Sequence, residues 1–67
     1  MPMKTEIKDN KYWIDCGKVT REWRAECQEW CWRNWGPNWG DVDTRFDHTI
    51  FIFHRAEHAS WFLLRWN

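Results

Sequence analysis

The stretch that most constrains the fold is residues 20–35, TREWRAECQEWCWRNW, which has the pattern of one amphipathic helix. Tryptophans and cysteines recur in it at the spacing that lines one helical face: Trp23, Cys27, Trp30 and Cys31. Thr20 can cap the amino end of this helix with its hydroxyl. Gly36 and Pro37 follow as a left-handed terminator and a residue that cannot continue the helix.

Trp32 does not belong to this stripe. At about 100° per residue it points almost directly away from Trp23 and Cys27, on a face shared with Arg21 and Gln28. An indole on the polar side of a helix is either covered by another part of the chain or available to a partner. The sequence leaves both interpretations open.

The length and the tryptophan content set the size of the core. A chain of 67 residues allows a single domain, residues 1–67, with a small core. Its eight tryptophans can each bury about 150–250 Å², so a few of them supply most of the hydrophobic drive. Eight indoles are difficult to hide in so small a body, and tryptophan is enriched at binding hot spots. We therefore expect at least two exposed tryptophans.

Charge and cysteine content narrow the classes of function. Ten basic and ten acidic side chains cancel without a long run of either sign, which disfavours a duplex DNA binder. The amino-terminal residues lack the apolar core of a signal peptide, and no apolar run is long enough to span a bilayer. Three cysteines, an odd number, without secretory features are typical of free thiols in a reducing compartment. We expect a cytoplasmic protein that does not enter a membrane.

Residues 3–16 alternate polar and apolar side chains on either side of Asp9 and Asn10. This pattern indicates a β-hairpin closed by a two-residue turn. The alternative is one strand over residues 11–16, preceded by a loose tail.

The clearest strand is HTIFIF, residues 48–53. Its isoleucines face one way and its phenylalanines the other, which predicts a central strand buried on both faces. Residues 36–47 are rich in Gly, Pro and Asp and therefore indicate a loop, within which a short strand over 42–46 is an option.

The last segment, residues 56–66, fits either a helix or a strand paired with residues 48–54. The helix is preferred, because the apolar residues follow helical spacing and Ala, Glu and Leu favour it. The predicted fold class is α+β, a small antiparallel sheet of three to four strands with two helices packed on one face.

The carboxy-terminal pattern F-x5-A-x2-F-x-L-R-W resembles that of small uncharacterised tailed-phage accessory proteins. It is carried by Phe53, Ala59, Phe62, Leu64, Arg65 and Trp66. A Trp/Cys helix that runs into Gly-Pro, here Trp30, Cys31, Gly36 and Pro37, resembles them too. Family members often have an acidic residue where this chain has His58. The resemblance covers about half of the chain and implies a small phage accessory protein that acts in a bacterial cytoplasm.

Two residue pairs form the best metal candidate. Cys27 and Cys31 with His54 and His58 offer two thiolates and two imidazoles to a tetrahedral zinc ion. Both cysteines belong to the apolar stripe, however, where a free cysteine behaves as a small hydrophobe. No Gly-rich oxyanion loop follows them to support a nucleophilic site. We therefore expect no metal, no cofactor and no enzymatic activity.

The leading functional hypothesis is protein binding. If both helices cover one face of the sheet, their outward sides would form an apolar patch, and polar residues would rim it. The predicted patch consists of Trp32, Trp61 and Leu64, with Arg21, Gln28, Glu57 and Arg65 as the rim. The expected partner is a bacterial host protein that the chain inhibits or modulates, and anti-defence activity such as CRISPR inhibition is one form of this. A homodimer contact or coverage by residues 36–47 is the alternative use of the patch.

The runner-up is single-stranded nucleic-acid or nucleotide binding. Exposed tryptophans interleaved with arginines are compatible with stacking platforms for bases. The residues concerned are Trp32, Trp35, Trp39 and Trp61, with Arg21, Arg24, Arg33, Arg45 and Arg65. The balancing acidic residues weaken the attraction of such a surface for phosphates, so nucleic acid is the less favoured partner.

Overall fold

The computed structural model describes residues 3–67 and confirms the α+β fold. Residues 1 and 2 of the predicted domain lie outside the described residues. The chain forms two successive strand–strand–helix units: β1 (Lys4–Lys8), β2 (Lys11–Asp15) and α1 (Arg21–Trp35), then β3 (Gly40–Arg45), β4 (His48–Phe53) and α2 (Ala56–Trp66).

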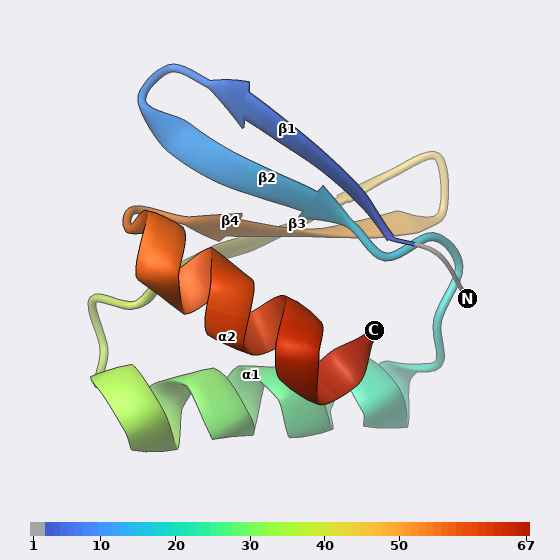
Figure 1. Ribbon diagram of the computed structural model, residues 1–67. Helices are drawn as coiled ribbons and strands as arrows, with labels where there is room; N and C mark the ends of the chain where they lie inside the picture. The colour runs from blue at the N-terminus through green and yellow to red at the C-terminus, as the bar shows by residue number, and fades with distance from the viewer. Residues whose placement is uncertain (1–2) are drawn as a thin grey trace.

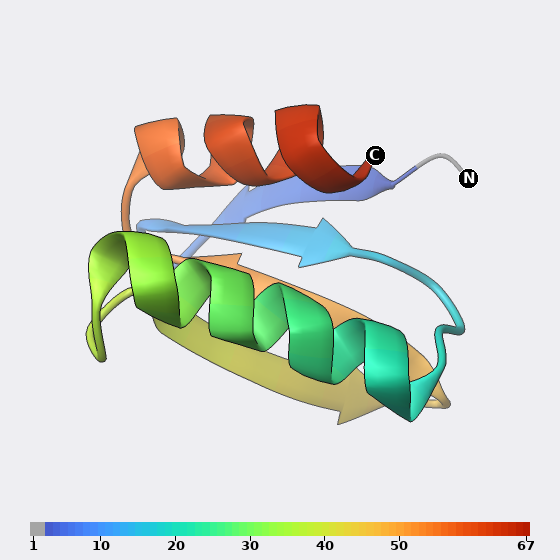
Figure 2. The same cartoon turned by 90° about the horizontal axis from the view of Figure 1, so that it is seen from below.

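The four strands form one antiparallel sheet in the order β1-β2-β4-β3. Both helices lie on the same face of this sheet and run in opposite directions (Figure 1). Seen from below, α2 lies on the β1 and β2 side and α1 on the β4 and β3 side (Figure 2). Within residues 3–67, no helix lies on the opposite face of the sheet.

Each hairpin closes through a two-residue turn with a left-handed backbone. Asp9 and Asn10 have φ of 55° and 62°, and Phe46 and Asp47 have φ of 50° and 69°. Positive φ at both central residues defines the turn that matches the right-handed twist of paired strands. The hairpin interpretation of residues 3–16 is therefore confirmed, and the alternative of a single strand is wrong.

The two units are related by an approximate twofold axis perpendicular to the sheet. The same sequence offset separates the first turn residues, Asp9 and Phe46, and the buried strand residues Ile14 and Phe51. Ile14 and Phe51 face each other in the β2–β4 ladder, so the axis passes between them. No repeat is visible in the sequence, because equivalent positions carry unlike side chains.

The core lies between the sheet and the two helices. Its largest fully buried side chains are Ile14, Cys16, Cys27, Cys31, Phe51, Phe53 and Phe62. Phe62 of α2 packs on two rings of β4, with centroids 4.8 Å from Phe51 and 5.2 Å from Phe53. The cysteine half of the predicted α1 stripe is thus completely buried, while Trp23 and Trp30 are half-buried at its border.

Both helices are as expected. The Thr20 hydroxyl accepts a hydrogen bond of 3.0 Å from the Trp23 N–H, and Gly36 follows the last residue of α1 with φ of 78°. Residues 56–66 are helical, with Ala59 and Phe62 facing the core, so the strand alternative for them is wrong.

Strand β4 is central, as predicted, and its two faces are covered differently. The phenylalanine face packs against the helices. On the helix-free face, Ile52 is buried and Ile50 is half-buried. Trp13 of β2 stands directly opposite Ile52 in the ladder, at the distance at which cross-strand side chains touch. On this face the Trp13 indole borders Ile52, and no second layer of the described residues packs over the sheet.

Two tryptophans of α1 provide a matched test of this packing. Trp30 contacts Phe62 and Trp66 of α2, whereas Trp32 is 59% exposed. Trp30→Ala should lower the free energy of unfolding by about 3–5 kcal/mol, and Trp32→Ala should change it by less than about 0.5 kcal/mol. Chemical denaturation of both variants measures this difference. Equal losses would show that the helix is oriented differently.

Two glycines provide a second matched test. A Cβ on Gly40, whose φ is 151°, would lie 2.0 Å from the carbonyl oxygen of Ile52, whereas one on Gly36 would meet nothing within 4 Å. Gly36→Ala should cost only the left-handed strain of about 1–2 kcal/mol. Gly40→Ala should cost about 3 kcal/mol or more, because strain and a backbone clash combine. Thermal unfolding of the two variants would contradict this if Gly40→Ala were the milder change.

Candidate functional site

The two helices meet through edge-to-face aromatic contacts. Trp23 lies 5.7 Å from Trp66 between ring centroids, and Trp30 lies 6.2 Å from Trp66. At the other end of the interface, the ring of His58 stacks on Trp35 at 4.1 Å, with 12° between the planes. These tryptophans are half-buried and hold α2 against α1.

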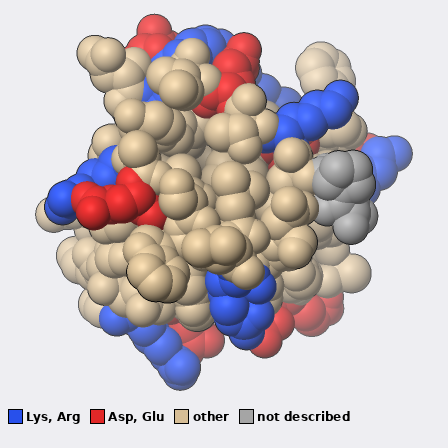
Figure 3. All heavy atoms as spheres, in the orientation of Figure 1, with Lys and Arg blue, Asp and Glu red and all other residues tan. Residues whose placement is uncertain are grey.

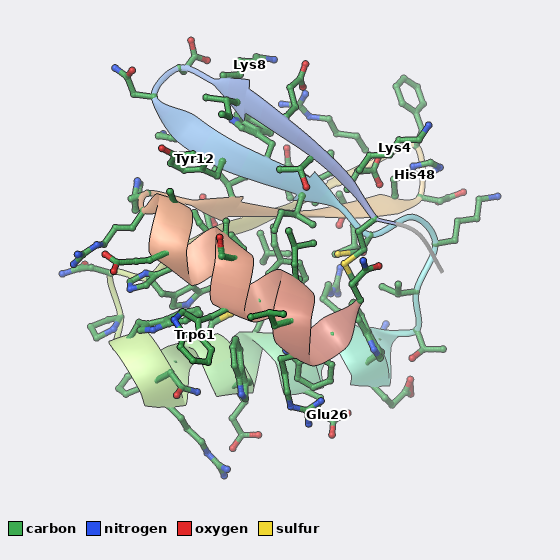
Figure 4. All side chains as sticks on the ribbon, in the orientation of Figure 1. Lys4, Lys8, Tyr12, Glu26, His48 and Trp61 are labelled. Atoms are coloured by element: carbon green, nitrogen blue, oxygen red, sulfur yellow. The ribbon has the colours of Figure 1, made fainter. Side chains whose placement is uncertain are left out.

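Trp61 and Leu64 lie on the outward side of α2. They are 60% and 79% exposed. Trp61 extends from α2 toward the carboxy-terminal end of α1 (Figure 4). It borders a hollow of about 170 Å³ that is also lined by Trp35, His58 and the ion pair of Arg55 with Glu57.

The surface around these side chains carries few charges. Figure 3 shows a broad central area over α2 without charged side chains, with Lys, Arg, Asp and Glu around its margin. We call the exposed Trp61 and Leu64, together with the half-buried Trp35 and His58 beside them, the α2 surface.

The structure does not bring Trp32 to Trp61. Trp30 contacts α2, and two residues further along α1 the helix has turned by about 200°. Trp32 therefore lies on the flank of α1 that faces away from α2. There it borders a separate hollow with Gln28, Glu29, Arg33 and Trp39. The predicted exposure of at least two tryptophans is confirmed, but Trp32 and Trp61 border two separate hollows and do not form the single patch inferred from the sequence.

The two arginines predicted for the rim of the patch, Arg21 and Arg65, also lie on different parts of the surface. Arg65 lies in the last turn of α2, with its guanidinium 4.1 Å from the centre of the Trp66 ring. Arg21 is the first residue of α1, about 16 Å along the helix axis from Trp32. Arg65 thus belongs to the helix that carries the α2 surface, whereas Arg21 borders a polar hollow with Lys18 and Asp47.

The structure separates the residues considered as zinc ligands. Cys27 and Cys31 are completely buried in the core, whereas His54 is exposed beyond the end of β4. Burial raises the pKa of Cys31 to about 12 and raises the pKa of Cys27 further. Within residues 3–67, no three His, Cys, Asp or Glu side chains gather as metal ligands would.

His58 is the titratable group that lies in the α2 surface. Its Nδ1 atom is buried and has no hydrogen-bond partner among the described residues. Partial burial lowers the pKa of His58, and the neighbouring Arg55 guanidinium lowers it further. The surroundings of the imidazole stacked on Trp35 therefore disfavour its protonated form.

The sequence interpretation missed a tryptophan on the helix-free face. Trp13 is half-buried there, and its indole N–H donates to the Lys8 carbonyl at 3.1 Å. The Lys8 ammonium and the Arg45 guanidinium lie 5.0 Å and 5.3 Å from the centre of its rings. Alternation along β2 could have found it, because Trp13 faces away from Tyr12 and Ile14.

A second polar contact on this face joins β2 to β4. The Asp15 carboxylate lies 3.3 Å from Nδ1 of His48 and accepts a 2.8 Å hydrogen bond from the Gly17 N–H. Partial burial alone would raise the pKa of Asp15, but these hydrogen bonds outweigh burial and lower it. Asp15 therefore contributes stability that is lost as the pH falls below about 3.8.

Comparison of the chain with protein-family models, curated proteins and solved structures finds no match. Neither helix in the described part of the chain has the length and hydropathy to cross a bilayer.

The depressed pKa of His58 predicts a pH dependence of stability. The unfolded state binds a proton near pH 6.5 and the folded state only at lower pH, so stability should fall as the pH drops through about 6.5. His58→Phe keeps an aromatic ring against Trp35 and should flatten the melting temperature between about pH 7.5 and pH 5.5.

The exposed His54 supplies the control for this experiment. His54→Gln should leave the slope of melting temperature against pH unchanged. An unchanged slope in His58→Phe would contradict the assignment of the proton to His58.

Proposed function

We propose that the protein is a non-enzymatic protein-binding module and that the α2 surface is its contact site. The observation that carries this proposal is the pair of exposed apolar side chains on α2, Trp61 and Leu64. The face of the molecule over α2 has a broad uncharged area with a charged margin (Figure 3). An apolar centre with a polar rim is the anatomy of a protein interface.

Trp61 has the properties of an interface anchor. Its indole is not needed in the core, which is filled by Phe62, Phe51 and Phe53 on the other side of α2. It stands beside the stacked Trp35 and His58, which provide a firm aromatic base. A large side chain with few rotatable bonds loses little conformational entropy on binding, and its N–H remains available to donate a hydrogen bond.

The thiols support a binding function over an enzymatic one. All three cysteines are buried, and burial raises the pKa of Cys16 and Cys31 to about 12. A nucleophilic cysteine needs an accessible thiolate, so these thiols are suited to packing.

The finer proposal is a phage-type accessory protein that binds and inhibits a bacterial host protein in the host cytoplasm. Anti-defence activity, including CRISPR inhibition, is a specific form of it. Its support is the resemblance of the carboxy-terminal pattern, most of which lies on α2. Phe53, Ala59 and Phe62 of that pattern are core residues, whereas Leu64 belongs to the α2 surface.

Single-stranded nucleic-acid or nucleotide binding remains the second candidate, now on the helix-free face. Trp13 between Lys8 and Arg45 is the observation that favours it, because an indole flanked by cations is a platform for a base and its phosphate. Glu6 stands opposite Trp13 in the β1–β2 ladder and weakens the attraction. Trp35 and Trp39, which the sequence suggested as stacking residues, are half-buried and buried.

The binding proposal is tested with three variants in a capture experiment from bacterial lysate, with and without nuclease treatment. Trp61→Ala and Leu64→Ser should retain the fold, because both side chains are exposed. Trp61→Ala should weaken binding of the captured protein about thirtyfold or more, as expected for a hot-spot tryptophan. Trp32→Ala, an equally exposed indole on the other flank, should bind normally.

Loss of capture in Trp32→Ala with normal binding by Trp61→Ala would overturn the assignment to the α2 surface. Capture that is abolished by nuclease and by Trp13→Ala would instead support the nucleic-acid candidate.

A further inference from the structure

The two edge strands of the sheet, β1 and β3, differ in whether their outward-pointing backbone N–H groups are hydrogen-bonded. The two-residue turns make Lys8–Lys11 and Arg45–His48 the first hydrogen-bonded pairs of their hairpins, and the bonding alternates from there. In β3, the N–H groups of Val42 and Thr44 therefore point away from β4. In β1, the N–H groups of Thr5 and Ile7 point away from β2.

The β3 edge is closed by its own side chains. The Asp41 carboxylate accepts the Val42 N–H at 2.8 Å, and the Asp43 carboxylate accepts the Thr44 N–H at 2.8 Å. A strand that approached β3 would have to displace both carboxylates. Occupied donors of this kind protect a sheet edge from pairing.

The β1 edge is open. Among the described residues, no side chain accepts a hydrogen bond from the N–H of Thr5 or Ile7. Every residue of β1 is exposed, and Ile7 is 71% exposed although it lies on the helix side of the sheet. Figure 1 shows β1 at the border of the sheet, where the β1–β2 hairpin rises away from the two helices toward its turn. An unpaired strand with free donors is a template for another strand.

The charges of β1 complement a second copy of the same strand. Lys4, Glu6 and Lys8 project from the helix-free side (Figure 4 labels the two lysines at opposite ends of β1). In an antiparallel pair with Thr5 opposite Thr5, Lys4 of each copy stands opposite Glu6 of the other. On the helix side, Ile7 of each copy then stands opposite Met3 of the other. Such cross-strand pairs are the units that stabilise a sheet.

We propose that β1 pairs antiparallel with β1 of a second copy, with Thr5 at the twofold axis, so that one sheet runs through both molecules. In this register Thr5 meets Thr5 and Ile7 meets Met3 as hydrogen-bonded pairs, which uses every open N–H of β1. A shift that places Glu6 opposite Glu6 would also match Lys4 with Lys8, and like charges opposite each other are destabilising. A shift that centres on Ile7 keeps Glu6 opposite Lys8 but runs into the turn at Asp9 after fewer pairs.

This inference is independent of the proposed function. The α2 surface contains no residue of β1, so a dimer through β1 leaves Trp61 and Leu64 for another protein. Conversely, a protein that binds no partner through α2 can still dimerise through β1.

The test is sedimentation velocity of the purified chain over a concentration series. The unmodified protein should be a dimer that dissociates on dilution. Glu6→Lys places Lys opposite Lys in two pairs and should weaken the dimer about tenfold or more. The double variant Lys4→Glu with Glu6→Lys exchanges the charges and should restore the dimer to within about threefold of the unmodified protein.

One control variant and one control measurement make the result specific. Lys18→Glu, an exposed residue after β2, should not change the dissociation constant. Circular dichroism of each monomer is needed, because Lys4 stands opposite Asp15 and Lys4→Glu adds a like-charge pair within the hairpin.

A monomer at all concentrations would overturn the proposal. The proposal would also be contradicted if Glu6→Lys with Lys8→Glu restored the dimer and Lys4→Glu with Glu6→Lys did not. That pattern belongs to the register centred on Ile7. A dimer that is lost in Trp61→Ala and unaffected by Glu6→Lys would place the second copy on α2 and also contradict the pairing.

Discussion

The contact of Phe62 with the phenylalanines of β4 determines how the rest of the molecule is arranged. It is the point at which α2 reaches the sheet, with ring centroids 4.8 Å from Phe51 and 5.2 Å from Phe53. Trp30 of α1 packs against the same ring at 6.3 Å, so both helices and the central strand meet at one side chain. A chain with few long aliphatic residues builds its core from such ring contacts, each of which buries a large area.

This packing divides the tryptophans into two groups. The interface between the helices contains Trp23, Trp30 and Trp66. Trp39 packs on the aromatic rings of β4, with its ring centroid 5.5 Å from that of Phe53. Trp61 is on the same helix as Phe62 but one residue earlier, which turns it by about 100° out of the core. Exposure of Trp61 is therefore a consequence of the Phe62 anchor, and the α2 surface follows from it.

The approximate twofold symmetry gives the two edge strands, β1 and β3, the same backbone geometry, but their side chains differ. Lys4 and Glu6 of β1 occupy the positions that Asp41 and Asp43 occupy in β3. A short aspartate can turn back to the next backbone N–H, whereas the longer lysine and glutamate side chains extend over the sheet. The same backbone geometry thus yields one closed edge and one open edge.

Much of the fold could be predicted from the sequence, because the features concerned are determined by residues that are close together in the chain. The hairpin at Asp9, the helix after Thr20 and the central strand at 48–53 all have local signals. The strand predicted within 42–46 begins earlier, at Gly40, and ends before Phe46, because Phe46 takes a left-handed turn conformation that a phenylalanine does not signal.

The site was harder to predict than the fold. A helical wheel shows that Trp32 and Trp61 point outward, and both do. It does not show which flank of α1 faces α2, and that depends on the long-range contacts of Trp30. Trp13 could have been assigned to the helix-free face from strand alternation, but nothing local places Arg45 beside it.

The central claim is the division of the eight tryptophans between the core and the surface. The most direct measurement is fluorine NMR of protein labelled with 5-fluorotryptophan, assigned by single Trp→Phe variants, in the presence of a soluble gadolinium chelate. The Trp32 and Trp61 signals should broaden strongly, and the Trp39 signal should remain sharp. Protection of Trp61 equal to that of Trp39 would contradict this division.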